Sequence, residues 1–338
     1  MATIHGKSGS TQYLLKGMKP INGKHFSTLA EMQHFYTHYE EILAETETTA
    51  ARKQDEKILA LSQEVTQLDK ELQEGLTRQT VDVDKNIEEL NRKITDAAGF
   101  LSRIGYRVQH GFAVALRDHH IHSPYAGLSR QLRNVRNERT NLINNRDFAI
   151  KWECNNVVNS YNFLKTNEPF LIGAYGEEVV IGSLSHLPDE YHVINDVNLR
   201  FSPAIRWKET GEYIQSCQID HIVVGPTGIF LLETKNWKSS NLEMNADVLV
   251  HQVRRSSYAL WYYTGDYYRY YERPKVLNVV ISLHGVNSGR KMDKYMDIIT
   301  PGQIYDYIQR QRYPALSDEI VKKFVKIVER QETCHSKY

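Results

Sequence analysis

Three charged side chains interrupt two strongly apolar runs in the middle of the chain. The stretch QIDHIVVGPTGIFLLETKNW (218–237) carries Asp220 in its first run, and Glu233 and Lys235 at the end of its second. The segment GPTG (225–228) between the runs has the proline and glycines of a tight turn. The two runs are therefore predicted to pair as an antiparallel hairpin.

The hairpin geometry predicts that the three charges converge at its open end. Side chains alternate faces along a strand, so Glu233 and Lys235 point the same way. Asp220 lies five residues before Gly225 and Glu233 five after Gly228, so symmetric pairing sets these carboxylates side by side. Such carboxylates repel each other, and a hard cation such as Mg²⁺ or Mn²⁺ relieves the repulsion. A neighbouring ammonium can orient a water or stabilise developing negative charge.

A structural ion pair between Asp220 and Lys235 at a strand end is the alternative reading of the same residues. Perturbed carboxylates cluster at functional sites only as a tendency. Residue types alone leave catalysis and structural pairing about equally supported.

Three blocks of the sequence resemble a known family. GEEVV (176–180), the stretch 218–237 and HQVRR (251–255) are similar to the signature blocks of the nuclease-related domain (NERD) family. That family belongs to the PD-(D/E)xK, or restriction-endonuclease-like, superfamily. The resemblance covers about 170–310, judged by block order. It implies a metal-dependent phosphodiesterase on a mixed sheet flanked by helices.

The resemblance also implies roles for individual residues. Glu177 matches the family's helix glutamate, and Asp220 matches its central metal-ligand aspartate. Glu233 and Lys235 match the ExK pair, and Gln252 matches a glutamine on the following helix. The implied mechanism has Asp220, Glu233 and Glu177 around one or two Mg²⁺, while Lys235 positions the attacking water.

Some features leave room for other readings. Glu178, rather than Glu177, is the alternative helix carboxylate. The stretch 238–250 is shorter than expected for the family, which leaves open how substrate is held. The insertion 201–216 lengthens the first hairpin without removing a proposed ligand.

Four arginines are predicted to contact nucleic acid: Arg254, Arg255, Arg269 and Arg273. Arg255 follows Gln252 by three residues and shares its helical face. The other pair lies in the aromatic-rich stretch 258–275, where rings and cations can hold bases and phosphates. A packing role for these rings is the more common alternative.

Runs of residues rich in β-branched side chains alternate with helical patterns in the C-terminal half. Strands are predicted at 191–199, 218–225, 228–235 and 275–282, and helices at 174–187, 246–264, 300–311 and 316–331. Pro169 and Gly173 mark the boundary before them. The predicted fold over 166–338 is an α/β (α+β) restriction-endonuclease-like domain with a central mixed sheet.

The N-terminal half carries a different pattern. We expect 1–26 to be a loosely packed arm and 27–165 an all-α, coiled-coil-like region whose first helix follows a capping box of Thr28 and Glu31. Apolar residues spaced by three and four predict an a/d seam: Ile58, Leu61, Val65, Leu68 and Leu72. The segment 77–84 predicts a break after which helices fold back, with one continuous rod as the alternative. The seam fits an intramolecular hairpin or a dimer.

Two further observations argue against a histidine metal site and against ATP hydrolysis. RDHHIHSP (117–124) is predicted to be a polar loop, because His119, His120 and His122 lack a familiar array of metal ligands. The chain has no GxxxxGK[ST] motif, so ATP hydrolysis is not expected.

Composition limits the classes of protein. The net charge is +1, so any nucleic-acid surface must be local. Three scattered cysteines do not form a disulfide framework, which favours a reducing cytosol. No apolar run is long enough for a membrane span and no secretory signal is evident, so a cytoplasmic location without a membrane partner is predicted.

The sequence thus predicts a metal-dependent nuclease that hydrolyses DNA phosphodiester bonds. The helical region is expected to serve homo-oligomer assembly or the sensing of a partner protein or trigger. The resemblance extends the implication to bacterial phage defence. A catalytically silent nucleic-acid-binding or assembly module on the same fold is the alternative.

Overall fold

The computed structural model describes seven stretches of the chain. They are 1–21, 23–237, 244–268, 273–285, 296–311, 315–331 and 334–335. The chain divides into two compact units, one formed by 1–37 with 159–338 and the other by 38–158. Each unit is described by itself below.

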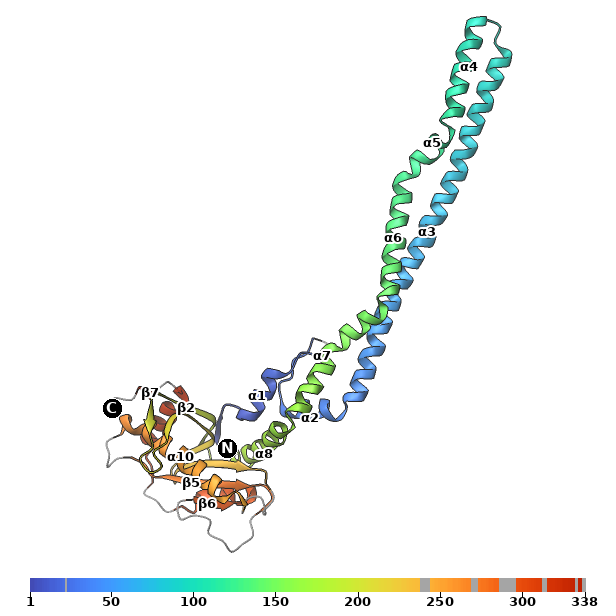
Figure 1. Cartoon of the computed structure of the whole chain (residues 1–338). Helices are drawn as coiled ribbons and strands as arrows, with labels where there is room; N and C mark the ends of the chain where they lie inside the picture. Colours follow the sequence, from blue (N-terminus) through green and yellow to red (C-terminus); the bar gives the residue numbers. More distant parts are fainter. Residues whose placement is uncertain are drawn as a thin grey trace. The chain divides into compact units, whose positions relative to one another are not determined.

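The first unit is built on a mixed sheet (Figure 1). Its strands are β1 (Thr3–His5), β2 (His192–Arg206), β3 (Tyr213–Gly225), β4 (Gly228–Lys235), β5 (Val276–Ser282), β6 (Met296–Ile299) and β7 (Cys334–His335). The order is β1-β2-β3-β4-β5-β6, with β7 paired to β2. β2, β3 and β4 form antiparallel pairs, whereas β4, β5 and β6 run parallel.

Helices cover both faces of this sheet. In this unit they are α1 (Gly9–Gly17), α2 (Leu29–Thr37), α8 (Glu168–Leu184), α10 (Ala246–Thr264), α11 (Ile304–Gln309) and α12 (Asp318–Arg330), with short 3₁₀ turns at Gly265–Tyr267 and Pro301–Gln303. One core cluster joins Leu260 of α10 and Phe324 of α12 to Leu231 of β4. The other joins Val180 of α8 to Phe230 of the same strand. Adjacent strand residues thus enter opposite cores, as strand alternation requires.

The predicted fold class is confirmed, because a mixed sheet flanked by helices follows a helical region. All four predicted strands and their neighbouring helices are present. The prediction missed β1, β6 and β7, which are short. Pro169 and Gly173 do not separate elements but lie inside α8, where the proline occupies the first turn and needs no backbone donor.

The first residues differ from the expected loose arm. Residues 9–17 form α1, which packs on α8, and Leu14 of α1 is fully buried. β1 adds a strand parallel to β2. Burial of apolar side chains explains why these residues are ordered. The Gly- and Lys-rich composition of the segment does not indicate this. The capping box is confirmed, since Glu31 and Thr28 each accept the other's backbone N–H at 3.2 Å.

The second unit is a helical hairpin. α3 (Tyr39–Asp96) is followed by α4 (Phe100–Ala115), α5 (Arg117–His122), a 3₁₀ turn (Ser123–Tyr125) and α6 (Ala126–Asn144); α7 (Arg146–Thr166) begins here and ends in the first unit. α4 and α6 both pack along α3. Val65, Leu68 and Leu72 of α3 bury themselves against Leu132 and Val135 of α6. The heptad seam is therefore filled within the chain.

Two local predictions in this unit are wrong. The break expected at 77–84 is absent, because Thr77 and Thr80 donate to the carbonyls of Gln73 and Leu76 and α3 runs on. The fold-back comes later, at 97–99, so the continuous rod is excluded as well.

The predicted polar loop RDHHIHSP is mostly α5. Ile121 is buried, which gives this short segment one packed face. Its histidines belong to no metal-binding group in the described part of the chain. Among the described helices, none combines the length and apolar composition needed to cross a membrane.

Candidate active site

The central hairpin forms in the predicted register. Gly225 pairs with Gly228, and pairing continues to His221 opposite Leu232. The next step of this register brings Asp220 to the level of Glu233. The carboxylate of Asp220 reaches back over β4, where its Oδ2 accepts the backbone N–H of Thr234 at 2.8 Å.

An irregularity in β2 and β3 gives Asp220 this position. Ile219 and Ile222 are three residues apart, yet both enter the core beside α10, and so do Ile194 and Val197 on β2. Strict alternation therefore fails at this level of the sheet. Asp196, between the two β2 residues, has a φ of 52°, a left-handed conformation that aspartate tolerates.

Glu233, Lys235 and Gln252 form a closed triangle of hydrogen bonds. Lys235 Nζ donates to Glu233 Oε1 at 2.7 Å and to Gln252 Oε1 at 3.1 Å. Gln252 Nε2 donates to the same Glu233 oxygen at 2.6 Å. Gln252 comes from α10, so that helix fixes the ends of the ExK side chains. Lys235 also lies over the ring of Trp237, 5.1 Å from its centroid.

The triangle decides against the proposed structural pair of Asp220 with Lys235. The only ion pair that Lys235 makes among the described residues is with Glu233, which is 2% exposed. Asp220 instead lies among charges that mostly oppose its ionisation, and the attraction of Lys235 is a smaller effect. Burial, followed by the charges of Glu233 and Glu177, raises the pKa of Asp220 well above its ordinary value. The site therefore stores electrostatic repulsion between carboxylates.

The donor set fits a hard cation. Asp220 uses Oδ2 and Glu233 uses Oε1 in the contacts above, and neither Oδ1 nor Oε2 receives a hydrogen bond from the described residues. Two carboxylate oxygens are thus left to coordinate Mg²⁺ or Mn²⁺. The described residues contain no group of three or more His, Cys, Asp or Glu side chains already arranged as a metal site.

Glu177 joins the site from α8 and is held from an unexpected direction. Ser10 of α1 donates its hydroxyl to Oε1 at 2.6 Å and its backbone N–H to Oε2 at 3.4 Å. Burial raises the pKa of Glu177, and these hydrogen bonds oppose that rise. Neighbouring Glu178 accepts from Thr11 instead. The charge of Glu177 contributes to the raised pKa of Asp220, so Glu177 stays the predicted helix carboxylate.

Ser10 is a site residue that the sequence reasoning missed. It precedes Glu177 by 167 residues and lies outside every quoted block. No periodicity or motif near Ser10 signals the contact; only the packing of α1 on α8 creates it.

The predicted nucleic-acid-binding arginines are not gathered at the carboxylates. Arg254 pairs with Glu209, and Arg255 donates to Glu212 at 2.7 Å. Both acids lie in the short β2–β3 connection, 207–212, within the insertion noted in the sequence. Arg273 stacks on Trp261, 4.4 Å from the ring centroid. Arg269 lies outside the described residues.

Glu233, Lys235 and Gln252 are thus joined by hydrogen bonds, and Asp220 and Glu177 are near enough for charge to act between them and Glu233. These five residues form the candidate cluster. Comparison with known proteins then places this part of the chain.

Residues 172–281 match the family model of the nuclease-related domain.

That match confirms the resemblance predicted from the sequence, and it contains all five residues of the cluster. The nuclease-related domain match begins at α8 and ends in β5, so Ser10 and the helical unit lie outside it. The chain is also similar to an uncharacterized protein of Bacillus anthracis, with 37% identity over 76 residues. This alignment covers 22% of the chain and 31% of that protein, so the chain spans about a third of the relative. No solved structure matches the chain.

Proposed function

We propose that this protein is a Mg²⁺-dependent nuclease that hydrolyses DNA phosphodiester bonds. The nuclease-related domain indicates a nuclease-related function. The observation that supports the finer proposal is the cluster itself, in which Asp220 and Glu233 each keep one carboxylate oxygen open beside the bound ammonium of Lys235.

The cation would be held by Asp220 and Glu233, with Glu177 behind them. When bound, it supplies positive charge that neutralises the phosphate and lowers the pKa of a coordinated water. Mn²⁺ has similar ligand preferences and is expected to substitute.

The side chains of this chain supply the remaining functions. Lys235 has three N–H donors, of which Glu233 and Gln252 take two. The third is available to orient an attacking water or to meet a phosphate oxygen. Gln252 holds both Glu233 and Lys235, so it keeps the ammonium aimed while substrate binds. Ser10 anchors Glu177, and the negative charge there favours a cation at Asp220.

A catalytically silent nucleic-acid-binding or assembly module is a second candidate. One observation favours it: within the described residues no three acidic or other metal-binding side chains form a ready site. Lys235 and Gln252 also both donate to Oε1 of the buried Glu233, a pattern that structural pairing alone would explain. The same cleavage assay separates the two candidates.

The helical unit is proposed to serve assembly, as a homo-oligomer or with a partner protein. The heptad seam is filled by α6, so it is not available for this. α4 instead leaves apolar side chains exposed along its length: Phe100, Leu101, Ile104, Val108 and Phe112. A cytoplasmic location and a role in phage defence complete the proposal, and protection of bacteria in a plaque assay tests the latter.

The proposal is tested by incubating plasmid and linear DNA with the purified chain in Mg²⁺, Mn²⁺ or EDTA. Nicked or linearised plasmid in either metal, and intact plasmid in EDTA, is the expected result. Folded Asp220→Ala protein is expected to leave the plasmid intact. If wild type yields no metal-dependent product, the silent-module alternative replaces the proposal. If Asp220→Ala cleaves at the wild-type rate, the assignment of the active site to Asp220 is wrong.

A further inference from the structure

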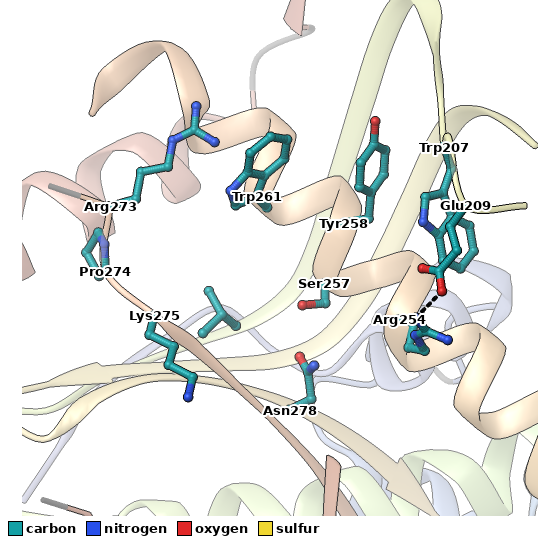
Figure 2. Close-up of a pocket in the computed structure, with 11 residues that line it drawn as sticks. Trp207, Glu209, Arg254, Ser257, Tyr258, Trp261, Arg273, Pro274, Lys275 and Asn278 are labelled. Carbon is teal, nitrogen blue, oxygen red and sulfur yellow. Dashed lines mark hydrogen bonds and ion pairs between the residues drawn. The ribbon is translucent and has the colours of Figure 1, made fainter. Parts of the chain in front are cut away.

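A cavity of about 520 Å³ opens beside α10, and none of the five residues of the candidate cluster lines it (Figure 2). Ser257, Tyr258 and Trp261 line it from the helix, and Lys275 and Asn278 from the start of β5. Its volume falls within the range of about 300–1,000 Å³ that small-molecule sites occupy.

An aromatic wall runs along this cavity. Trp207, Tyr258 and Trp261 lie in a row, as Figure 2 shows. Ring centroids are 6.1 Å apart between Trp207 and Tyr258, and 6.0 Å between Tyr258 and Trp261, with interplanar angles of 22° and 26°. The row holds its shape by stacking, although Trp261 remains 44% exposed.

The same three rings line a second cavity of about 750 Å³. Arg206, the last residue of β2, and Lys208 of the β2–β3 connection belong to its lining, along with Tyr213 and Tyr262. The wall therefore separates two adjoining hollows, each large enough for a small organic group. Two neighbouring cavities of this size could hold two successive units of a polymer.

The charges around both hollows are mostly positive. The first is lined by Arg254, Arg273 and Lys275, and one acidic residue, Glu209, lines both. Arg254 pairs with Glu209, which fixes its guanidinium at the rim. Arg273 is fixed by stacking on Trp261. Cations beside aromatic rings match a ligand that has both phosphate and base.

We propose that the two hollows hold successive unpaired nucleotides of a single nucleic-acid strand. Bases lie against the part of the aromatic wall that remains exposed, since Arg273 already covers one face of Trp261, and phosphates meet the cations at the rim. A paired duplex keeps its bases stacked inside the helix and cannot insert them into such hollows, so the expected ligand is single-stranded. This inference rests on the proposed function, and it names the form of substrate.

The hollows share α10 and β5 with the candidate site. α10 carries Gln252 of the candidate site and, along the same helix, Arg254, Tyr258 and Trp261. The rise from Gln252 to Trp261 is roughly 13 Å at 1.5 Å per residue. On β5, Asn278 of the first hollow lies two residues before Val280, which pairs with Glu233.

The test measures binding rather than cleavage. A fluorescein-labelled 12-nucleotide oligothymidylate is titrated with the full chain in EDTA, and fluorescence anisotropy gives the dissociation constant. Trp261→Ala is expected to weaken binding about fivefold or more, the lower end of what losing one base–ring stack produces. Trp261→Phe keeps an aromatic face and is expected to restore most of the affinity.

Matched controls separate the wall from general effects. Trp152→Ala removes an exposed tryptophan of α7 and is expected to leave the dissociation constant unchanged. Lys275→Gln is expected to reduce the slope of log affinity against log salt by about 0.7. A blunt 12-base-pair duplex should bind more weakly than the single strand, and Trp261→Ala should remove that preference.

Equal binding of the oligonucleotide by wild type and Trp261→Ala overturns the inference. So does binding of thymidine monophosphate without binding of the oligonucleotide, because that result marks a mononucleotide site. If the chain cleaves DNA through Asp220 but Trp261→Ala binds normally, only this inference fails. If Trp261 controls binding and no metal-dependent cleavage occurs, only the nuclease proposal fails.

Discussion

Asp220 is the residue on which the electrostatics of the site depend. Its carboxylate accepts the Thr234 N–H while the charges of Glu233 and Glu177 oppose its ionisation. Its folded-state pKa is raised, so the folded protein binds a proton more tightly than the unfolded chain does. Stability is therefore lost as pH rises from the unfolded pKa, about 4, through the folded pKa.

Asp220→Asn should make the protein more stable at neutral pH. The asparagine oxygen can still accept from Thr234, while the repulsion disappears. We expect the Tm at pH 7.5 to rise by about 2–4 °C for each kcal/mol of repulsion removed. Thermal melts followed by circular dichroism measure it. Below pH 4 the side chain at position 220 is neutral in both wild type and Asp220→Asn. A difference in Tm that persisted there would contradict the electrostatic cause.

Mg²⁺ should reduce or reverse the difference in Tm between Asp220→Asn and wild type. A cation bound between Asp220 and Glu233 relieves the same repulsion and stabilises only the folded state. We expect millimolar Mg²⁺ to raise the Tm of wild type and to leave that of Asp220→Asn nearly unchanged. Equal shifts in both proteins would show that the cation binds elsewhere.

Ser10→Ala should impair the site from outside the matched domain. Both oxygens of Glu177 accept from Ser10, and losing the hydroxyl removes a bond that lowers the pKa of Glu177. We expect kcat to fall about tenfold, as for residues that orient ligands, and its acid limb to move to higher pH. Ser183→Ala is the control, because that hydroxyl bonds its own helix. An unchanged pH profile would limit Ser10 to a packing role.

The residue types and order of the cluster could be predicted, but its contacts could not. Apolar runs around a turn place Asp220 near Glu233, and that much follows from strand geometry. Lys235 pairs with Glu233 in a geometry that Gln252 of α10 fixes by bonding to both. The contact of Ser10 with Glu177 depends on packing between residues 167 positions apart, for which no local pattern exists.

At the scale of elements, the β3–β4 turn sets the register that aligns the carboxylates. Gly225 lies against the buried ring of Tyr191, whose hydroxyl bonds Thr227 at 2.9 Å. Gly228 has a φ of 140°, a backbone conformation that residues other than glycine rarely adopt. Both glycines of GPTG are thus required by geometry, one by space and the other by backbone conformation.

Gly225→Ala should destabilise the hairpin. The new Cβ would lie 2.2 Å from the ring of Tyr191, which cannot move away because it is fully buried. We expect the free energy of unfolding to fall by about 1–3 kcal/mol, as overpacking typically costs. Gly302→Ala meets no atom within 4 Å and serves as the control. Urea denaturation of both variants makes the comparison, and equal midpoints would show that the turn yields without cost.

Element prediction succeeded where periodicity had a single cause. The spans of β4, β5 and α10 are close to those predicted, whereas β2 and β3 are longer than predicted. It failed at 77–84, where β-branched and acidic residues suggested a break, because hydroxyl bonds to the preceding turn accommodate threonine in α3. It failed again at Asp196, where a positive φ changes the alternation without a sequence signal.

At the scale of the whole molecule, a sheet-based unit and a helical unit are stabilised separately. The seam of the helical unit is internal: Leu68 is buried against α6, whereas Leu59 on the same helix is exposed. Heptad spacing predicted the seam, but spacing is equally compatible with an intramolecular partner and a second chain. Only the position of α6 decides.

Leu68→Ala should therefore weaken the helical unit without changing the mass of the protein. Deleting a buried leucine side chain costs about 2–5 kcal/mol, so the melting of helical circular dichroism should move to lower temperature. Leu59→Ala should melt like wild type. Light scattering at several concentrations should give the same mass for both variants. A lower mass for Leu68→Ala alone would show that the seam holds chains together.

The central claim is that Asp220 and its neighbours hydrolyse a phosphodiester with a divalent cation. The most direct test compares single-turnover DNA cleavage in Mg²⁺ by wild type, Asp220→Asn and Asp196→Asn. Asp196 is a nearby aspartate on β2 that bonds Gln218 and belongs to no proposed ligand set. We predict a loss of at least about 100-fold for Asp220→Asn and near-normal cleavage by Asp196→Asn. Equal rates for wild type and Asp220→Asn would contradict the account.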